Sequence, residues 1–156
     1  MLKKTITYED FNGESRTEDF YFNLNKNELA KLEHSKGGGL TEWVKKAVQA
    51  KDGKTILDVF DEILAATYGE KSLDNREFVK SPEIFQKFKS TNAYDIIFMD
   101  LVTNADSAAE FITMCMPKEL REGAIKAIDQ EKKNHPELTS GTVNNNDASV
   151  IKKVES

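Results

Sequence analysis

The spacing of apolar residues changes after residue 24, and this change constrains the fold more than any other feature. Up to that point apolar and polar residues alternate, which is typical of strands with one buried face. The apolar members are Leu2, Ile6, Tyr8, Phe20, Phe22 and Leu24. Beyond it, apolar residues recur every three or four positions, which predicts amphipathic helices. The sequence therefore predicts an α+β protein, mostly α, with an N-terminal β-hairpin packed on a cluster of about six to seven short helices.

The connection of the hairpin is predicted from the pair Asn12-Gly13, which lies between the two alternating segments. This pair is able to supply the two positive φ angles of a type I′ turn, and a longer loop is the alternative.

Capping residues divide the helical part of the chain. Asn25 is expected to begin a helix that the run Gly37-Gly38-Gly39 ends, and Asn104 to begin a later one. Ser81-Pro82 is a helix start of the same kind. We expect a helix near residues 40–48, a third ended by Gly69, a polar connector over residues 70–80, and a last helix that begins near Pro117. The expected inward faces include Leu57, Ile96, Met99 and Leu120.

The length of 156 residues favours one domain. Apolar periodicity stops after Ile128, and the stretch that follows is rich in Asn, Ser, Thr and Gly. Such a stretch does not bury enough apolar surface to offset its ordering entropy. We therefore expect a single globular domain over residues 1–131 and a flexible polar C-terminal tail over residues 132–156.

Charge and composition exclude several classes of function. The net charge is −5, so binding to a nucleic-acid backbone is not expected. The first residues lead straight into the alternating pattern without the apolar stretch of a signal peptide, so none is expected, and no apolar run is long enough to span a bilayer. A single cysteine forms no internal disulfide and fits a reducing compartment. We expect a cytoplasmic protein that binds neither nucleic acid nor membrane.

A search for reactive groups predicts no catalytic site and no cofactor. Cys115 lies on an apolar helix face between two methionines, which indicates a core thiol. The two histidines, His34 and His135, lie far apart in the sequence, so no usual zinc site is expected. The triple glycine lacks the Gly-Lys-Ser/Thr ending of a phosphate-binding loop and is interpreted as a connector.

The paired carboxylates fit surface positions better than a catalytic dyad. Asp58 and Glu62 share a helix face opposite the apolar stripe, where acids are solvated. Asp95 and Asp100 are five residues apart and so lie on different sides of a helix. We expect the protein not to be an enzyme.

Apolar side chains are the remaining candidates for a functional surface. Trp43 is of a type enriched in binding hot spots, and flexible methionines suit an adaptable groove. The candidate partner-binding residues are Trp43, Met99, Met114 and Met116. For each of them a place in the core is the alternative.

Several local strings, in order, resemble the tail assembly chaperones of long-tailed, siphovirus-type phages of Gram-positive bacteria. The resemblance covers about residues 3–130 and departs at Asn75, where glycine is expected in similar chains. The strings are residues 4–13 (KTITYEDFNG), 17–24 (TEDFYFNL), 38–41 (GGLT), 68–72 (YGEKS), 78–81 (FVKS) and 93–94 (AY).

This resemblance implies a non-catalytic late protein that binds the tape measure protein while tail tube subunits assemble around it. It also implies a location in the host cytoplasm and absence from the mature virion. The alternative is a structural phage component, such as a head–tail connector or tail completion protein. An uncharacterised enzyme is a third hypothesis, which the residue types disfavour.

The family further implies that a programmed translational frameshift gives a longer form that recruits the tail tube protein. The pairs Lys132-Lys133 and Lys152-Lys153 are each compatible with an A-rich slippery heptamer. Ordinary lysines of a solvated tail are the alternative.

Overall fold

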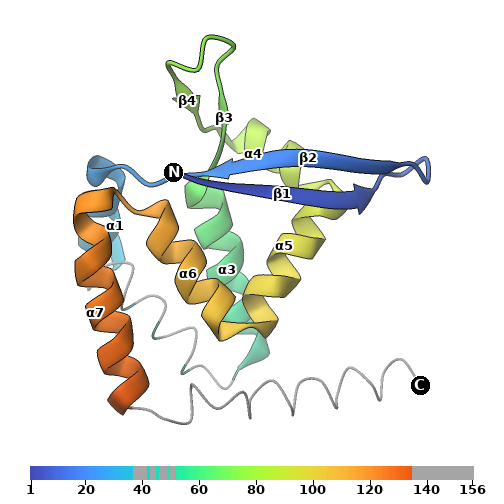
Figure 1. Ribbon diagram of the computed structural model, residues 1–156. Helices are drawn as coiled ribbons and strands as arrows, with labels where there is room; N and C mark the ends of the chain where they lie inside the picture. The colour runs from blue at the N-terminus through green and yellow to red at the C-terminus, as the bar shows by residue number, and fades with distance from the viewer. Residues whose placement is uncertain (37–41, 43–44, 46–48, 50–51, 135–156) are drawn as a thin grey trace, which may run out of the picture.

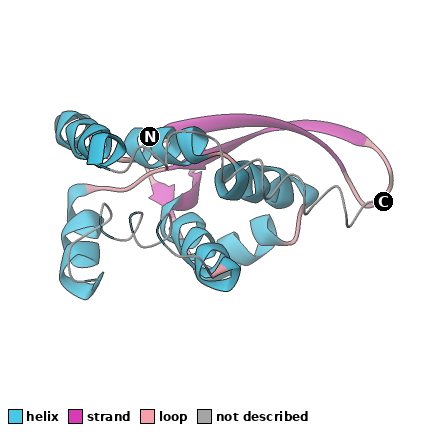
Figure 2. Ribbon diagram, turned by 90° about the horizontal axis from the view of Figure 1, so that it is seen from below, coloured by secondary structure: helices cyan, strands magenta, loops and turns pink. Residues whose placement is uncertain are grey.

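The computed structural model describes residues 1–36, 42, 45, 49 and 52–134. Six helices and a four-stranded antiparallel sheet of order β1-β2-β3-β4 make up the described part of the chain. Most of the helices lie below the long β1–β2 hairpin in Figure 1, and the tip of this hairpin extends beyond them in both views (Figures 1 and 2). The predicted α+β class, mostly α, is confirmed.

The N-terminal hairpin is confirmed, but its turn differs from the type I′ prediction. Strands β1 (Leu2–Glu9) and β2 (Ser15–Phe22) pair from Leu2↔Phe22 to Glu9↔Ser15. Residues 10–14 form a longer loop in which Gly13 has a positive φ of 81° and Asn12 does not. The Asp10 carboxylate accepts hydrogen bonds from the Asn12 and Glu14 N–H groups, so Asp10 organises the loop.

The expectation of a polar connector over residues 70–80 is wrong. Strands β3 (Tyr68–Lys71) and β4 (Phe78–Val79) form a second hairpin there, and β3 pairs with β2 at Tyr21↔Gly69 and Phe22↔Tyr68. This hairpin projects from the sheet at the top of Figure 1.

Gly69 is accordingly not a helix cap, because it belongs to β3. Its role is close approach: a Cβ atom there would lie 2.7 Å from the Phe78 ring and 2.8 Å from the Val79 carbonyl oxygen.

Three of the six described helices start at the predicted capping residues. The Asn25 side chain accepts from the Glu28 N–H (2.9 Å) at the start of α1 (Lys26–Lys36), and the Glu28 carboxylate accepts from the Asn25 N–H (2.9 Å). This reciprocal pair is a capping box. Ser81 caps α4 (Pro82–Lys89), and Asn104 caps α6 (Ala105–Cys115).

The other described helices are α3 (Gly53–Thr67), α5 (Asn92–Thr103) and α7 (Lys118–Asn134). None of the helices described is long and apolar enough to cross a membrane. Most of the predicted helix at residues 40–48, the glycine run and the segment 135–156 lie outside the described residues. Helix α7 ends three residues beyond the expected domain boundary.

The core lies between the sheet and the helices and is rich in aromatic rings. Phe22 contacts Phe88 (5.9 Å between ring centroids) and Phe111 (5.0 Å), and Tyr68 stacks on Phe88 at 4.2 Å. Cys115 is fully buried in this core, as expected.

Four apolar side chains that were expected to face inward are exposed instead. They are Leu57, Ile96, Met99 and Leu120. On α5, Ile97 and Leu101 form the buried face, so the wider apolar stripe does not mean burial on several sides.

Lys80 joins three segments beside the core. Its ammonium donates to the carbonyl oxygens of Asn23 (2.5 Å) and Ala66 (2.9 Å) and to the Glu28 carboxylate (2.8 Å). Because Ala66 lies in the last turn of α3, the cation also satisfies a carbonyl at a helix C-terminus. This side chain ties α1 and α3 to the strand hairpin.

Candidate partner-binding surface

The reactive groups of the described residues occupy structural positions. Burial raises the pKa of the Cys115 thiol to about 12, so the thiol stays protonated at neutral pH. Tyr94 donates a hydrogen bond to Asp61, which also accepts from the Lys89 ammonium at 2.8 Å. Among the described side chains, no three His, Cys, Asp or Glu residues gather as a metal site would require.

The four candidate binding residues do not share one surface. Met99 is 46% exposed on α5, Met114 is half-buried on α6, and Met116 is buried in the core. Trp43 lies outside the described residues. Met114 lines a groove between α6 and α7, whereas Met116 has little surface to offer a partner.

The groove that contains Met114 lies between α6 and α7 and has a volume of about 570 Å³. It is lined by Asp106, Ala109, Glu110, Thr113, Met114, Ile125 and Asp129. Its polar Thr113 hydroxyl donates to the Ala109 carbonyl oxygen (2.8 Å), so this hydroxyl is already satisfied. Ile125 is 47% exposed on α7 and contributes apolar surface with Met114 and Ala109. The floor of the groove is therefore mainly apolar.

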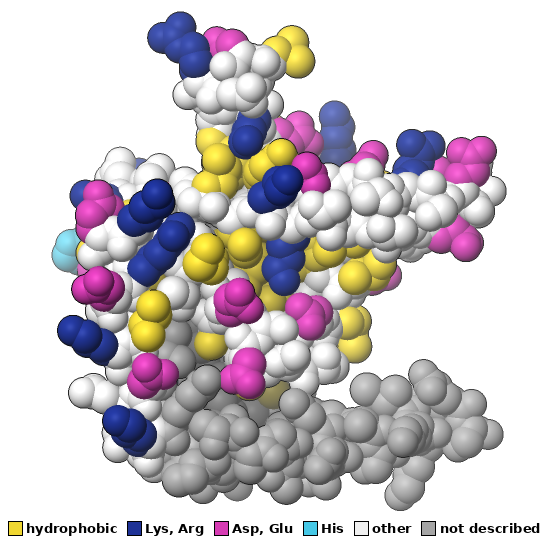
Figure 3. All heavy atoms as spheres, in the orientation of Figure 1, with side chains coloured by type: hydrophobic (Ala, Val, Ile, Leu, Met, Phe, Trp, Pro, Cys, Tyr) yellow, Lys and Arg dark blue, Asp and Glu magenta, His cyan; other side chains and the backbone are white. Residues whose placement is uncertain are grey.

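The lining of this groove also carries acidic side chains. Asp106, Glu110 and Asp129 are among its lining residues, and no lysine or arginine is. Figure 3 shows acidic, basic and apolar side chains interspersed on the face that carries α6 and α7, so the acidic character is confined to the lining of the groove. An apolar floor with carboxylates around it suits an amphipathic helix with basic flanks, because each part of the helix meets its complement.

The corner between α6 and α7 is fixed by Arg121. Its guanidinium donates from Nε to the Met116 carbonyl oxygen (3.0 Å) and from Nη2 to the Met114 carbonyl oxygen (3.0 Å). Carbonyls at the end of α6 are thereby paired with a side chain of α7, as a helix C-terminus requires. The two walls of the groove are therefore held in a defined relation.

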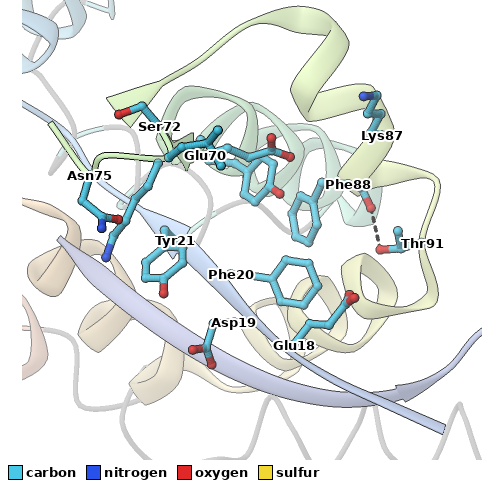
Figure 4. A pocket seen from close by; sticks show the side chains of 14 residues that line it. Glu18, Asp19, Phe20, Tyr21, Glu70, Ser72, Asn75, Lys87, Phe88 and Thr91 are labelled. Carbon is cyan, nitrogen blue, oxygen red and sulfur yellow. Dashed lines mark hydrogen bonds between the residues drawn. The ribbon is translucent and has the colours of Figure 1, made fainter. Parts of the chain in front are cut away.

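A second hollow, of about 700 Å³, lies beside β2 under the projecting β3–β4 hairpin (Figure 4). Phe20, Tyr68 and Phe88 supply aromatic surface, and the Lys71 ammonium lies 4.2 Å from the centroid of the Tyr21 ring. Its charged residues are of both signs: Glu18, Asp19 and Glu70 against Lys71 and Lys87. This hollow therefore lacks the one-sided charge of the α6–α7 groove.

Sequence reasoning missed most of the α6–α7 groove. Ile125 was not among the apolar residues expected to face inward on the last helix, so its position gave no signal of a groove. The acidic residues gave no signal, because their convergence depends on how α6 and α7 pack.

An open groove with apolar surface between two helices is a geometry that protein-binding domains use to hold a partner helix. A family model described as phage tail assembly chaperone matches residues 1–155, and the chain belongs to this family. No curated protein and no solved structure matches the chain significantly.

Proposed function

We propose that this protein binds the tape measure protein of a long-tailed phage and promotes assembly of the tail tube around it, without catalysis. The family match over residues 1–155 is the observation that carries this proposal. The protein would act in the host cytoplasm and leave before the virion is complete. A frameshifted longer form would recruit the tail tube protein.

The α6–α7 groove is the proposed docking site on the chaperone. A tape measure protein is long and helical, so its exposed apolar helix faces need cover until tube subunits enclose them. Met114 and Ile125 offer apolar contact to such a face, and the carboxylates around them favour a helix whose flanks carry Lys or Arg. The occupant is therefore expected to be a basic amphipathic helix.

Co-expression of the full chain with the tape measure protein of the same phage tests the function. We expect a soluble complex that elutes as one species, whereas the tape measure protein alone aggregates. A tape measure protein that is equally insoluble with and without this chain would contradict the proposal.

A matched pair of substitutions on α7 tests the docking site. Ile125→Glu places a charge in the apolar floor and is expected to weaken capture by at least about tenfold, as loss of a buried anchor does. Leu120→Glu is the control, because Leu120 is similarly exposed on the same helix (44% against 47%) but does not line the groove. If both variants lose capture to the same extent, or if neither loses it, the tape measure protein binds at another surface.

Mass spectrometry of purified virions separates this function from that of a head–tail connector or tail completion protein. A chaperone is expected in infected cells and absent from the particles. A stoichiometric amount in the particles would favour the structural role.

A further inference from the structure

The α6–α7 groove carries two carboxylates that are available to an occupant. Glu110 belongs to α6 and Asp129 to α7, so each of the two helices that form the groove contributes one of them (Figure 1). Neither side chain forms a hydrogen bond or an ion pair with another described residue. The same lining contains Met114 and the 47% exposed Ile125. The complement of this groove is therefore a segment with an apolar face and two cations.

The chain itself contains a segment of this kind beyond α7. It is the run Val150-Ile151-Lys152-Lys153-Val154, which lies outside the described residues. Positions 150, 151 and 154 share one face of a helical turn, because side chains three and four residues apart are neighbours there. The two lysines lie outside this face, and their long apolar stems let the ammonium groups extend past its edges.

The length of the chain allows the groove and this run to meet within one molecule. Ile125 lies nine residues before Asn134 on α7, which is about 14 Å along the helix. Residues 135–149 connect Asn134 to the run. A segment of this length spans up to about 50 Å when extended and about 21 Å on average as a flexible coil. The tether therefore reaches the groove and holds the run near it at an effective concentration on the order of 1 mM.

We propose that residues 150–154 occupy the α6–α7 groove of their own chain while no partner is bound, with Lys152 and Lys153 paired to Glu110 and Asp129. The proposal rests on the docking role that the proposed function gives to this groove, and it adds a regulation of that site. A run of five residues buries too little surface for tight binding, so the tether and not the affinity keeps it in place. A longer helix of the tape measure protein displaces it.

Paramagnetic relaxation in the full chain tests the contact. A nitroxide label on Ser156→Cys reports the position of the run, and Cys115 does not compete for the label because it is fully buried. We expect selective broadening of the methyl signals of Met114 and Ile125. Broadening that is absent from α6 and α7, or equal over the whole domain, would overturn the proposal.

A mixed sample tests whether the contact forms within one molecule. It contains labelled chain without isotope enrichment and enriched chain without the label, so any broadening in it comes from contacts between copies. We expect none. Broadening as strong as in the singly labelled protein would assign the groove to a second copy and overturn the proposal.

Ile151→Glu and Val143→Glu are a matched pair of variants beyond α7. Both replace an apolar residue by a carboxylate, but Val143 has no charged residue within three positions. The broadening at Met114 is expected to fall at least about threefold in Ile151→Glu, because loss of an anchor weakens a contact about tenfold or more. It should be unchanged in Val143→Glu. Equal effects of the two variants would show that the run does not hold the groove.

Charge exchange tests the ion pairs. The double variant Lys152→Glu, Lys153→Glu is expected to lose the broadening, and the added changes Glu110→Lys and Asp129→Lys are expected to restore it. Broadening that the double variant leaves unchanged would contradict the assigned pairs.

Capture of the tape measure protein separates this proposal from the proposed function. The run and the partner compete for one groove, so Ile151→Glu is expected to raise the apparent affinity for the tape measure protein at least about twofold. If the relaxation contact is present and this affinity is unchanged, the proposal stands and the docking site assigned to the tape measure protein is wrong. If the contact is absent and capture still depends on Ile125, the proposed function stands and the proposal is overturned.

Discussion

Lys80 shows how a single side chain outside the apolar core holds the fold. Its ammonium satisfies two backbone carbonyls and one carboxylate from three separate segments. Removing a charged donor leaves these acceptors without their partner, which costs more than the net value of the bonds themselves.

Lys80→Met is therefore expected to lower the free energy of unfolding by about 2–3 kcal/mol. Lys26→Met is the control, because Lys26 forms only a solvent-exposed ion pair with Glu119 (3.5 Å) and should change stability by less than about 1 kcal/mol. Urea denaturation of both variants measures the free energy of unfolding. Similar losses of this free energy in the two variants would show that the contacts of Lys80 do not stabilise the fold.

Asn75 lies at the position where similar chains are expected to have glycine, and its backbone conformation explains why asparagine is accepted there. Its φ is 59°, in the left-handed region that glycine adopts freely and that asparagine tolerates better than other residues. Asn75→Ala is expected to lower the free energy of unfolding by about 1 kcal/mol, whereas Asn75→Gly should leave it nearly unchanged. Equal stability of the alanine and glycine variants, measured by urea denaturation, would contradict this account.

At the scale of elements, local signals predicted the helices, and non-local contacts decided the rest. Asn25, Ser81 and Asn104 mark their helix starts because a cap acts within three residues. The β3–β4 hairpin gave no such signal, since β4 has two residues and β3 is defined by its pairing with β2 and β4. Gly69 was interpreted as a cap because its actual constraint, the nearby Phe78 ring, is visible only in the packed structure.

The candidate site was predictable only in part for the same reason. A methionine on a helix face, such as Met114, is recognisable from its spacing. The groove itself depends on how Arg121 fixes α7 against α6, which no local pattern encodes.

The boundary of the folded domain leads to a prediction for the C-terminal segment. Apolar periodicity ends within α7, and the polar composition beyond it does not support a core. We propose that deletion of residues 135–156 leaves the midpoint of thermal unfolding within about 2 °C of that of the full chain. Differential scanning calorimetry measures this, and a lost or broadened transition would show that the segment belongs to the domain.

At the scale of the whole molecule, burial of a thiol and of tyrosine hydroxyls links stability to alkaline pH, and Tyr94 is one of these tyrosines because burial raises its pKa as well. Burial raises the pKa of Cys115 and of Tyr68 to about 12, from ordinary values of 9.0 and 10.0. Between the ordinary pKa and the raised pKa of each group, the folded state keeps a proton that the unfolded state loses. The contribution of these groups to the free energy of unfolding is therefore complete below about pH 9 and is lost as the pH rises toward 12.

Urea midpoints are therefore expected to decline above about pH 9. In Cys115→Ala the decline should begin about one pH unit later, because only the tyrosine contribution remains. A decline that begins at the same pH in both proteins would rule out the thiol as a cause.

The central claim for the whole molecule is that the α6–α7 groove holds a helix of the tape measure protein. Hydrogen exchange of the full chain, free and in the co-expressed complex, tests it most directly, because binding slows exchange where a partner covers the backbone. We predict that protection increases mainly in residues 105–129 and is lost in the Ile125→Glu variant. Protection confined to other elements, with α6 and α7 unchanged, would contradict the claim.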